Sequence, residues 1–344
     1  MENLRAIEFI KSLMAQGDPT AESGVYMGRS LPEMAELWCQ QTGVPIKGGT
    51  AATLNNALVT TDFGDVPAGV MQMIANNNFD LYRQSYEALT GHATTQNFGL
   101  SYITSMKAAG LLDEVKGGAE IPLMGDLEIG AEEYFLKTYA GRIPISRQDM
   151  INDNVQALFD KGRYAIRTTK RTWNTLFFRH LLANGTMADG EALFSAAHGN
   201  LLTGSSSALD ADSLQLAMQT LRGMTDADGQ PYGIQPKNLL VGPTNETTAA
   251  KLIRDMASVD ADRLNLVVDP LAELSSLGGT STNFWVFPDP NVVPVINTVG
   301  LVGKTMAPDI EGKVLSGGDT YDFKIRIDAA IATASTYAVK SVGA

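Results

Sequence analysis

The sequence contains few of the residues that build disulfides, metal centres and redox sites. Its 344 residues include one cysteine, Cys39, and three histidines, His92, His180 and His198. A single cysteine excludes an internal disulfide and a cysteine-clustered metal site, and it is typical of a reducing compartment. The histidines are far apart in the sequence, and neither a G-x-G-x-x-G nor a Walker sequence is present. We therefore predict no metal site and no cofactor.

Positive charge and long apolar runs are also scarce. The chain has 26 Lys and Arg against 38 Asp and Glu, a formal net charge of −12. A field of this sign repels phosphate, which argues against a free-standing nucleic-acid binder but allows a local basic strip. No apolar run reaches about 18 residues. The acidic start, Met1-Glu2-Asn3, is not followed by an apolar stretch, so we expect neither a membrane-spanning helix nor a secretory signal.

The longest regular pattern lies in residues 153–183. Apolar and small side chains repeat there at i, i+3, i+4 and i+7, and no proline interrupts them. The pattern predicts one helix roughly 45 Å long, here called the spine helix, which Asn184-Gly185 would end. Either the rest of its surface is solvated and ion-paired, or it faces a polyanion or an acidic neighbouring subunit. The basic residues of this face are Lys161, Arg163, Arg167, Lys170, Arg171 and Arg179.

Residues 98–145 have the composition of a long β ribbon punctuated by glycines. Strands are expected at 98–106, 121–127 and 133–145. A ribbon of this length has little to pack against within one subunit, so we expect it to lie across a neighbour. Acidic residues that we expect on this ribbon include Asp113, Glu114, Glu120, Asp126 and Glu128.

The remaining segments predict mixed α and β structure, with 44 % hydrophobic residues to form a core. Residues 1–58 are too short and interrupted to form a domain. Residues 59–97 favour a helix near Pro67 and a second helical turn at 82–89. Residues 200–320 alternate helices with short strands, one of them at 292–296, as in an α/β domain. Apolar and polar residues alternate in 321–339, which predicts a strand that could cover the spine helix.

Catalytic patterns are weak. Ser195 precedes His198, but no G-x-S-x-G nucleophile elbow accompanies them, so a hydrolase is the least favoured function. His180 lies on the apolar stripe of the spine helix and is interpreted as a core histidine. Residues 226–229 resemble the start of a calcium loop, but Lys237 stands where that loop requires an acidic residue. We predict that the chain is not an enzyme.

Three local sequences resemble one known family. They are YAGRIPISRQDMINDN at 139–154, ADGEALFSAAHGNLLTG at 188–204 and PKNLLVGPTNETTAAKLI at 236–253. Together they resemble the Mu-like prophage major head subunit family of tailed-phage major capsid proteins, in the order and spacing of that family's blocks, over residues 60–340. The phrase LFSAAHGNLLTG is the most specific of them.

The resemblance implies an α+β fold, similar to the Hong Kong 97 phage capsid fold, and a division of the chain into named parts. Whether the first part is a trimmed pro-region or a retained extension stays open. The implied parts are an N-terminal extension or pro-region at 1–58, an N-terminal arm at 59–97, an extended β loop at 98–145, a peripheral domain with the spine helix at 146–199 and 321–344, and an axial domain at 200–320.

The implied function is that of the major capsid protein of a tailed phage or prophage, which builds the icosahedral head around double-stranded DNA. Its partners would be its own copies in pentamers and hexamers, scaffold, portal or decoration proteins, and packaged DNA in non-specific contact, with no membrane. Assembly in the host bacterial cytoplasm would lead to the virion. The alternative is an encapsulin-type nanocompartment shell of the same fold, which would house enzyme cargo. The sequence blocks favour the phage family.

Overall fold

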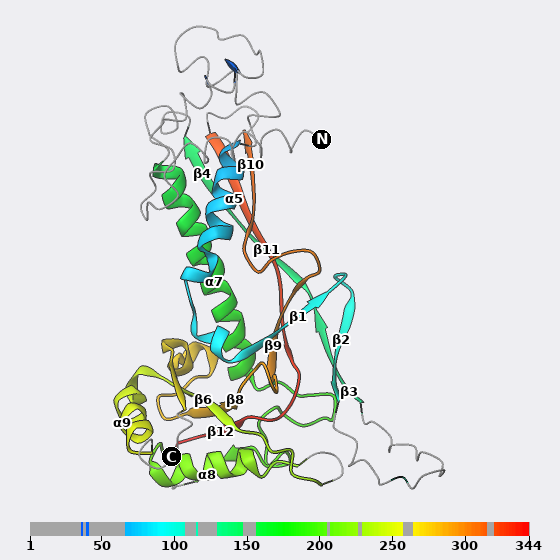
Figure 1. Ribbon diagram of the computed structural model, residues 1–344, viewed down its shortest axis with the longest axis vertical. Coiled ribbons are helices and arrows are strands. Elements are labelled where there is room, and N and C mark those ends of the chain that lie inside the picture. The colour runs from blue at the N-terminus through cyan, green and yellow to red at the C-terminus, as the bar shows by residue number, and fades with distance from the viewer. Residues whose placement is uncertain are drawn as a thin grey trace. The chain divides into compact units, whose positions relative to one another are not determined.

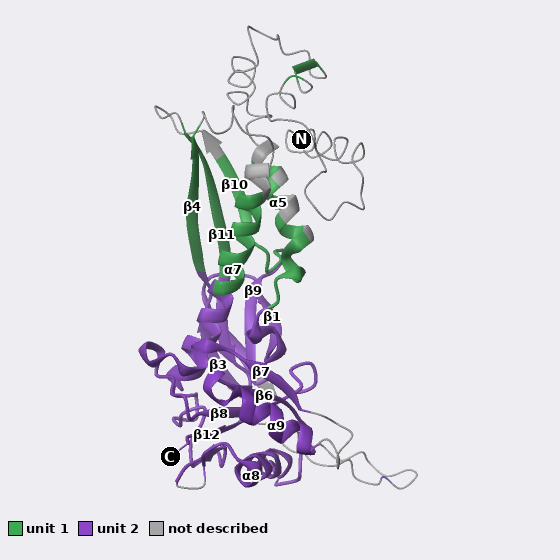
Figure 2. Ribbon diagram, turned by 90° about the vertical axis from the view of Figure 1, so that its left-hand side faces the viewer, with its two compact units in different colours: residues 1–83, 138–171, 304–328 green, residues 84–137, 172–303, 329–344 purple. Residues whose placement is uncertain are grey.

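The computed structural model describes residues 36, 39–40, 66–106, 115, 129–146, 156–204, 207–225, 229–256, 264–314 and 320–343. The chain forms two compact units that are interleaved in sequence (Figure 2). The first comprises residues 1–83, 138–171 and 304–328, and the second comprises 84–137, 172–303 and 329–344. Helix α7 (Gln156–Ala183) and strand β11 (Thr320–Thr333) each contribute residues to both. The five-part division implied by the resemblance stays a prediction.

In the first unit, helix α5 lies beside strand β10 (Figure 1). The Gln72 side chain joins the two, because its amide nitrogen donates to the Pro308 carbonyl at 2.8 Å and its oxygen accepts from the Ile310 amide at 2.6 Å. Strand β10 pairs antiparallel with β11, which also pairs with β4. The elements are α5 (Val66–Asn78), η2 (Phe79–Leu81), β4 (Lys137–Ser146), β10 (Asp309–Val314) and the first parts of α7 and β11.

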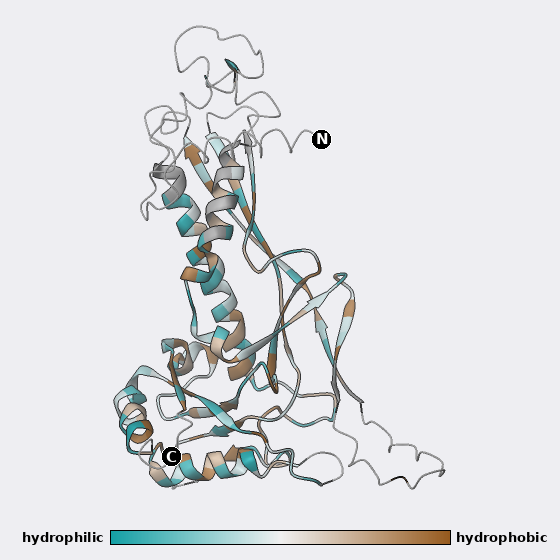
Figure 3. Cartoon of the chain, in the orientation of Figure 1, coloured by the Kyte–Doolittle hydropathy of each residue, from teal (hydrophilic) through white to brown (hydrophobic). Residues whose placement is uncertain are grey.

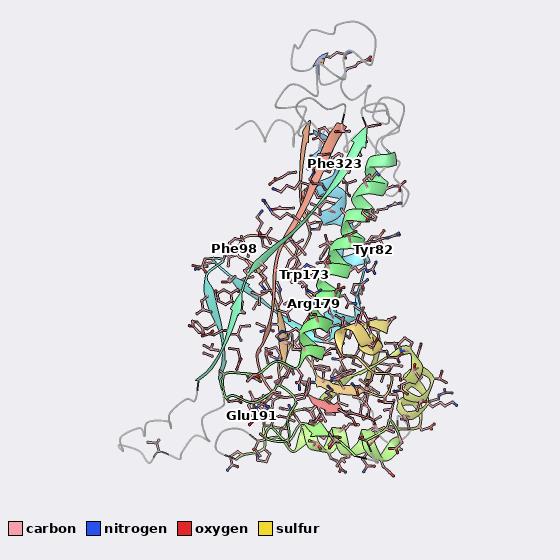
Figure 4. All side chains as sticks on the ribbon, turned by 180° about the vertical axis from the view of Figure 1, so that it is seen from behind. Tyr82, Phe98, Trp173, Arg179, Glu191 and Phe323 are labelled. Atoms are coloured by element: carbon pink, nitrogen blue, oxygen red, sulfur yellow. The ribbon has the colours of Figure 1, made fainter. Side chains whose placement is uncertain are left out.

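The alternation predicted for β11 is confirmed by burial in the first unit. Tyr321 and Phe323 are buried with their ring centroids 4.8 Å apart, and Phe323 is labelled in Figure 4. On the opposite face, Arg326 donates to Glu311 at 3.0 Å across the β10–β11 pair. Arg142 of β4 forms an ion pair with Asp322. The sheet of this unit therefore has one aromatic face and one face linked by ion pairs.

The second unit contains a five-stranded sheet with order β5-β12-β8-β6-β7 and two helices. Leu214 and Leu221 of α8, Val241 of β6 and Phe284 of β8 are fully buried in one cluster. Its elements are β5 (Leu201–Leu202), α8 (Ala211–Arg222), β6 (Pro236–Val241), α9 (Glu246–Met256), β7 (Asn265–Val268), β8 (Phe284–Pro288) and β12 (Val339–Ser341), with single turns η3 (Ser85–Ala88), η4 (Pro243–Asn245), η5 (Pro270–Glu273) and η6 (Ser275–Leu277).

A second layer of the same unit carries a two-stranded ribbon. Strand β1 (Thr90–Thr95) pairs parallel with β9 (Ile296–Leu301), and β9 pairs antiparallel with the end of β11. Strands β2 (Leu100–Met106) and β3 (Ile129–Phe135) pair antiparallel with each other and form the β2–β3 ribbon. Tyr134 of this ribbon is buried against Val299 and Ala330, so the ribbon rests on this sheet.

Several predicted elements are confirmed and others are wrong. The spine helix is present as α7 and ends at Ala183, and the next residue, Asn184, has the left-handed φ of 45° that the stop signal requires. The strand predicted at 292–296 is wrong, because Asp289 closes a turn with Asn291 there and β9 starts at Ile296. Residues 133–145 form parts of two strands instead of one, and 82–89 contains the single turn η3. The predicted strand at 121–127 lies outside the described residues.

Among the described residues, no helix combines the length and the apolar composition needed to cross a bilayer. Helix α7 has the length but carries charged residues throughout.

A buried polar cluster joins three segments of the second unit. The Asp269 carboxylate, 6 % exposed, accepts from the Asn174 amide at 2.8 Å, from the Leu271 backbone N–H at 2.8 Å and from the Ser85 hydroxyl. The Asn174 oxygen accepts in turn from the Tyr86 N–H at 3.3 Å. Because each buried donor finds an acceptor, the cluster fixes η3 and η5 to this part of α7.

Replacing Asp269 with alanine will remove the acceptor of the buried Asn174 amide and of the Leu271 N–H, whereas the Ser85 hydroxyl keeps the Asn174 oxygen as a second acceptor. We expect Asp269→Ala to lower the free energy of unfolding by about 3 kcal/mol, as measured by urea unfolding followed by circular dichroism. Asp80→Ala removes an exposed carboxylate and serves as the control, with no measurable change. Equal stability of the two variants would contradict a structural role for the cluster.

Candidate functional site

The basic face predicted on the spine helix is only partly exposed. Arg167 and Arg171 are exposed, and Lys161 and Arg163 are half-buried. Lys170 is 3 % exposed, so the prediction that it shares an open basic surface is wrong. The remaining residues place a strip of positive charge on the α7 part of the first unit.

The burial of Lys170 has a clear physical cause. Its ammonium lies 3.8 Å from the centroid of the Phe79 ring, and the Arg167 guanidinium lies 5.2 Å from the Tyr82 ring, which is labelled in Figure 4. Both aromatic residues follow α5 in the sequence and belong to the same unit. A lysine can bury its carbon stem and keep its charge over the face of an aromatic ring. The long-range contact, which the helical period does not reveal, removes Lys170 from the surface.

The acidic residues predicted on the extended β loop are not among the described residues. They are Asp113, Glu114, Glu120, Asp126 and Glu128.

The β2–β3 ribbon exposes large apolar side chains on one face. Leu100 is opposite Phe135 and Tyr102 is opposite Glu133 in the register of the two strands. Exposed fractions are 42 % for Leu100, 52 % for Tyr102 and 54 % for Phe135. Phe98, just before β2, is exposed as well and is labelled in Figure 4, and hydrophobic residues are visible along β2 in Figure 3. The other face carries the buried Tyr134.

These ribbon residues were not singled out by the sequence patterns. Apolar side chains occupy both faces of β2, with Tyr102 and Ile103 adjacent, so the simple alternation of a half-buried strand is hidden. The usable signal was the run of aromatic and aliphatic residues in a segment already expected to lie across a neighbour.

The histidine of the Ser195 and His198 pair is not arranged to activate the serine. The His198 Nε2 atom lies 2.8 Å from Asp189 Oδ2, and Nδ1 lies 3.2 Å from the Leu193 carbonyl. The Ser195 hydroxyl accepts from the His198 backbone N–H at 3.2 Å. A general base must reach the hydroxyl proton with its ring nitrogen. The contacts therefore describe a loop held by hydrogen bonds.

The segment that resembles the start of a calcium loop is described only at its last residue. Gly229 has a left-handed φ of 78°, as a turn requires, while residues 226–228 lie outside the described part. Within the described ranges, no three His, Cys, Asp or Glu side chains are grouped so that they could hold a metal ion.

His180 is half-buried on α7 instead of lying in the core, but its ring has a hydrogen-bond partner, as predicted. Its Nε2 lies 2.9 Å from the Thr333 hydroxyl at the end of β11, within the second unit. Burial lowers the pKa of His180 below the ordinary value of 6.5, because the charged imidazolium loses its water. The same contact confirms that β11 returns to α7.

Comparisons with known proteins give one family and one shared fold. A family model described as phage capsid protein matches residues 131–341. No curated protein matches the chain. A phage-related protein from Bordetella bronchiseptica RB50 is similar in structure, with a TM-score of 0.50 and 15 % identity, over 79 % of this chain and 95 % of that one. At this identity the likeness concerns the fold alone.

Two further solved structures are similar at lower scores. The capsid of Myoviridae phage XM1 has a TM-score of 0.43 and 13 % identity, over 77 % of this chain and 97 % of that one. A virus-like particle from Pyrococcus furiosus has a TM-score of 0.48 and 11 % identity, over 79 % of this chain and 98 % of that one.

The lowered pKa of His180 predicts how stability changes with pH. Below pH 6.5 the unfolded chain binds more protons than the folded chain at this site, so the free energy of unfolding falls as the pH decreases through that value. We expect a smaller loss between about pH 7.5 and pH 5.5 for His180→Gln than for the wild type, measured by urea unfolding. Parallel losses in the two proteins would show that His180 titrates freely.

Proposed function

The chain belongs to the phage capsid protein family, and we propose that its copies close into the icosahedral head shell of a tailed phage, with a fold of the Hong Kong 97 type. A major capsid protein is a structural protein whose function is geometric. Each contact between copies is modest, and the sum is large because every subunit is held by several neighbours. Membership of the Mu-like subfamily is part of this proposal, on the strength of the three sequence blocks.

The observation that carries the proposal is the apolar outer face of the β2–β3 ribbon. Leu100, Tyr102 and Phe135 are each more than 40 % exposed on one face. Large exposed apolar side chains gathered on one surface mark interaction sites. A ribbon of two strands is also marginal without a partner on its faces. We infer that a neighbouring copy covers this face in the shell.

The proposed assembly assigns roles to the rest of the chain. Residues 59–97 act as an arm, 98–145 as an extended loop that contains the ribbon, 146–199 and 321–344 as the peripheral domain, and 200–320 as the axial domain of pentamers and hexamers. Residues 1–58 are an extension or pro-region. Scaffold, portal or decoration proteins complete the partners, and assembly takes place in the host cytoplasm.

The exposed basic residues of α7 are proposed to face packaged DNA or the acidic loop of a neighbour. Arg167 and Arg171 are exposed and Arg163 is half-buried, with its guanidinium 3.9 Å from Asp160. Arginine side chains neutralise phosphate without reading base sequence, as a shell around any DNA requires. The acidic residues Asp113, Glu114, Glu120, Asp126 and Glu128 are the proposed complementary surface.

Removing apolar area from the ribbon will impair assembly without unfolding the subunit. We expect Tyr102→Ser with Phe135→Ser to form few or no closed particles in electron microscopy, because exposed side chains contribute to interfaces and little to the fold. The matched variant Tyr102→Phe with Phe135→Leu keeps the apolar surface and will form particles. A normal particle yield from the serine variant would show that the ribbon is not part of the interface.

Reversing charge on α7 tests the basic surface. We expect Arg167→Glu with Arg171→Glu to give empty or incomplete heads in infected cells, since like charges then face phosphate or the acidic loop. Arg167→Lys with Arg171→Lys keeps the charge and will package DNA. Lys170 is left unchanged because it is buried. DNA-filled heads from the glutamate variant would contradict this role.

A further inference from the structure

A cavity of about 300 Å³ lies at the base of the ribbon, within the second unit. Thr104 and Glu132 of the ribbon line it, together with residues 187–189, His198, 292–294 and 334–337. Its volume is at the lower end of the range for ligand pockets. A single large side chain is an occupant of suitable size.

Two carboxylates, those of Glu132 and Asp189, give this cavity a negative charge. One oxygen of Glu132 accepts from the Ala188 N–H at 2.9 Å, and the second oxygen remains for a ligand. Asp189 lies 2.8 Å from the His198 ring. Asn297 also lines the cavity, but its side-chain oxygen is buried beside Gly91 and does not face the cavity. The acceptor that is open to a ligand is therefore the second oxygen of Glu132, which favours a ligand rich in donors.

The remaining walls are flat and apolar. The rings of Tyr232 and Tyr337 are stacked, with centroids 5.2 Å apart and an interplanar angle of 14°. Val292, 77 % exposed, and Val293 complete this side. Such walls suit the carbon stem and the planar head of a long side chain.

We propose that this cavity binds the guanidinium of an arginine from a second copy of the chain. Arginine offers only donors, in a planar fork that matches a carboxylate and stacks on aromatic rings. An anionic ligand would be repelled by Glu132 and Asp189. A lysine ammonium would match the charge but not the flat tyrosine surface.

A second copy is the proposed occupant for two reasons. The cavity borders the outer face of the ribbon, the proposed interface, at Thr104, which lies on the same face as Tyr102. Val292 at the side of the cavity is a large apolar residue open to solvent. Every copy also carries exposed arginines, Arg167, Arg171 and Arg179 among them. This choice of occupant rests on the proposed function, whereas the guanidinium preference of the cavity does not.

The cavity is tested first without assembly. N-acetyl-arginine amide is titrated into full-length subunits kept below the concentration at which they associate, with binding followed by ligand-detected NMR. N-acetyl-citrulline amide has the same shape without the charge. We expect only the arginine probe to bind, and about tenfold or more weaker binding to Glu132→Gln, which keeps the contact to Ala188 but loses the charge. Glu133→Gln, on the opposite face of β3, is the control and will bind as the wild type does.

Three results would overturn the proposal: equal binding of the two probes, no binding of the arginine probe to the wild type, or equal binding of that probe to the two variants.

The occupant is tested by particle formation under conditions in which the wild type assembles. Fewer or less stable particles from Glu132→Gln than from Glu246→Gln, which changes an exposed residue of α9 outside the ribbon and the cavity, support a second copy. Equal particles overturn that occupant even if the probe binds. Absence of wild-type particles under all conditions would instead contradict the proposed function and leave the probe result standing.

Discussion

The structure depends on one long helix whose buried stripe serves two units. Ala165 and Ile166 are fully buried in the first unit, and Trp173 and Phe177 are buried in the second. Each large side chain of this kind contributes about 1.5 to 3 kcal/mol when it leaves water. Strand β11 is shared in the same way, and its Thr333 meets His180 of α7. Because these two elements bury side chains in both units, the segments joined to them can be specialised for contacts outside the subunit.

The β2–β3 ribbon is the clearest of those specialised segments. It rests on the second unit through Tyr134 and turns Leu100, Tyr102 and Phe135 to solvent. An isolated enzyme gains nothing from such a surface, whereas a shell subunit buries it against its neighbours. The arginine cavity at the base of the ribbon would add a specific charged contact to a broad apolar one, a combination that fixes register as well as affinity.

Regular local patterns made α7, α8 and most of β11 predictable, because their burial follows the helix or strand period. Strand β1 was missed because its sequence, TGHATT, has no apolar alternation and is held by pairing with β9. The burial of Lys170 depends on Phe79, 91 positions earlier in the chain, and the cavity gathers residues from 103 to 337. Contacts of that sequence separation leave no trace in local spacing, so the surfaces were harder to predict than the elements.

Electron cryo-microscopy of particles formed by the purified full-length chain tests the central claim most directly. The account predicts closed shells in which the outer face of the ribbon is covered by a neighbouring copy. Shells in which Leu100, Tyr102 and Phe135 remain in solvent would contradict the assigned interface. A chain that stays a small oligomer under every salt condition, even with scaffold protein added, would contradict the shell itself.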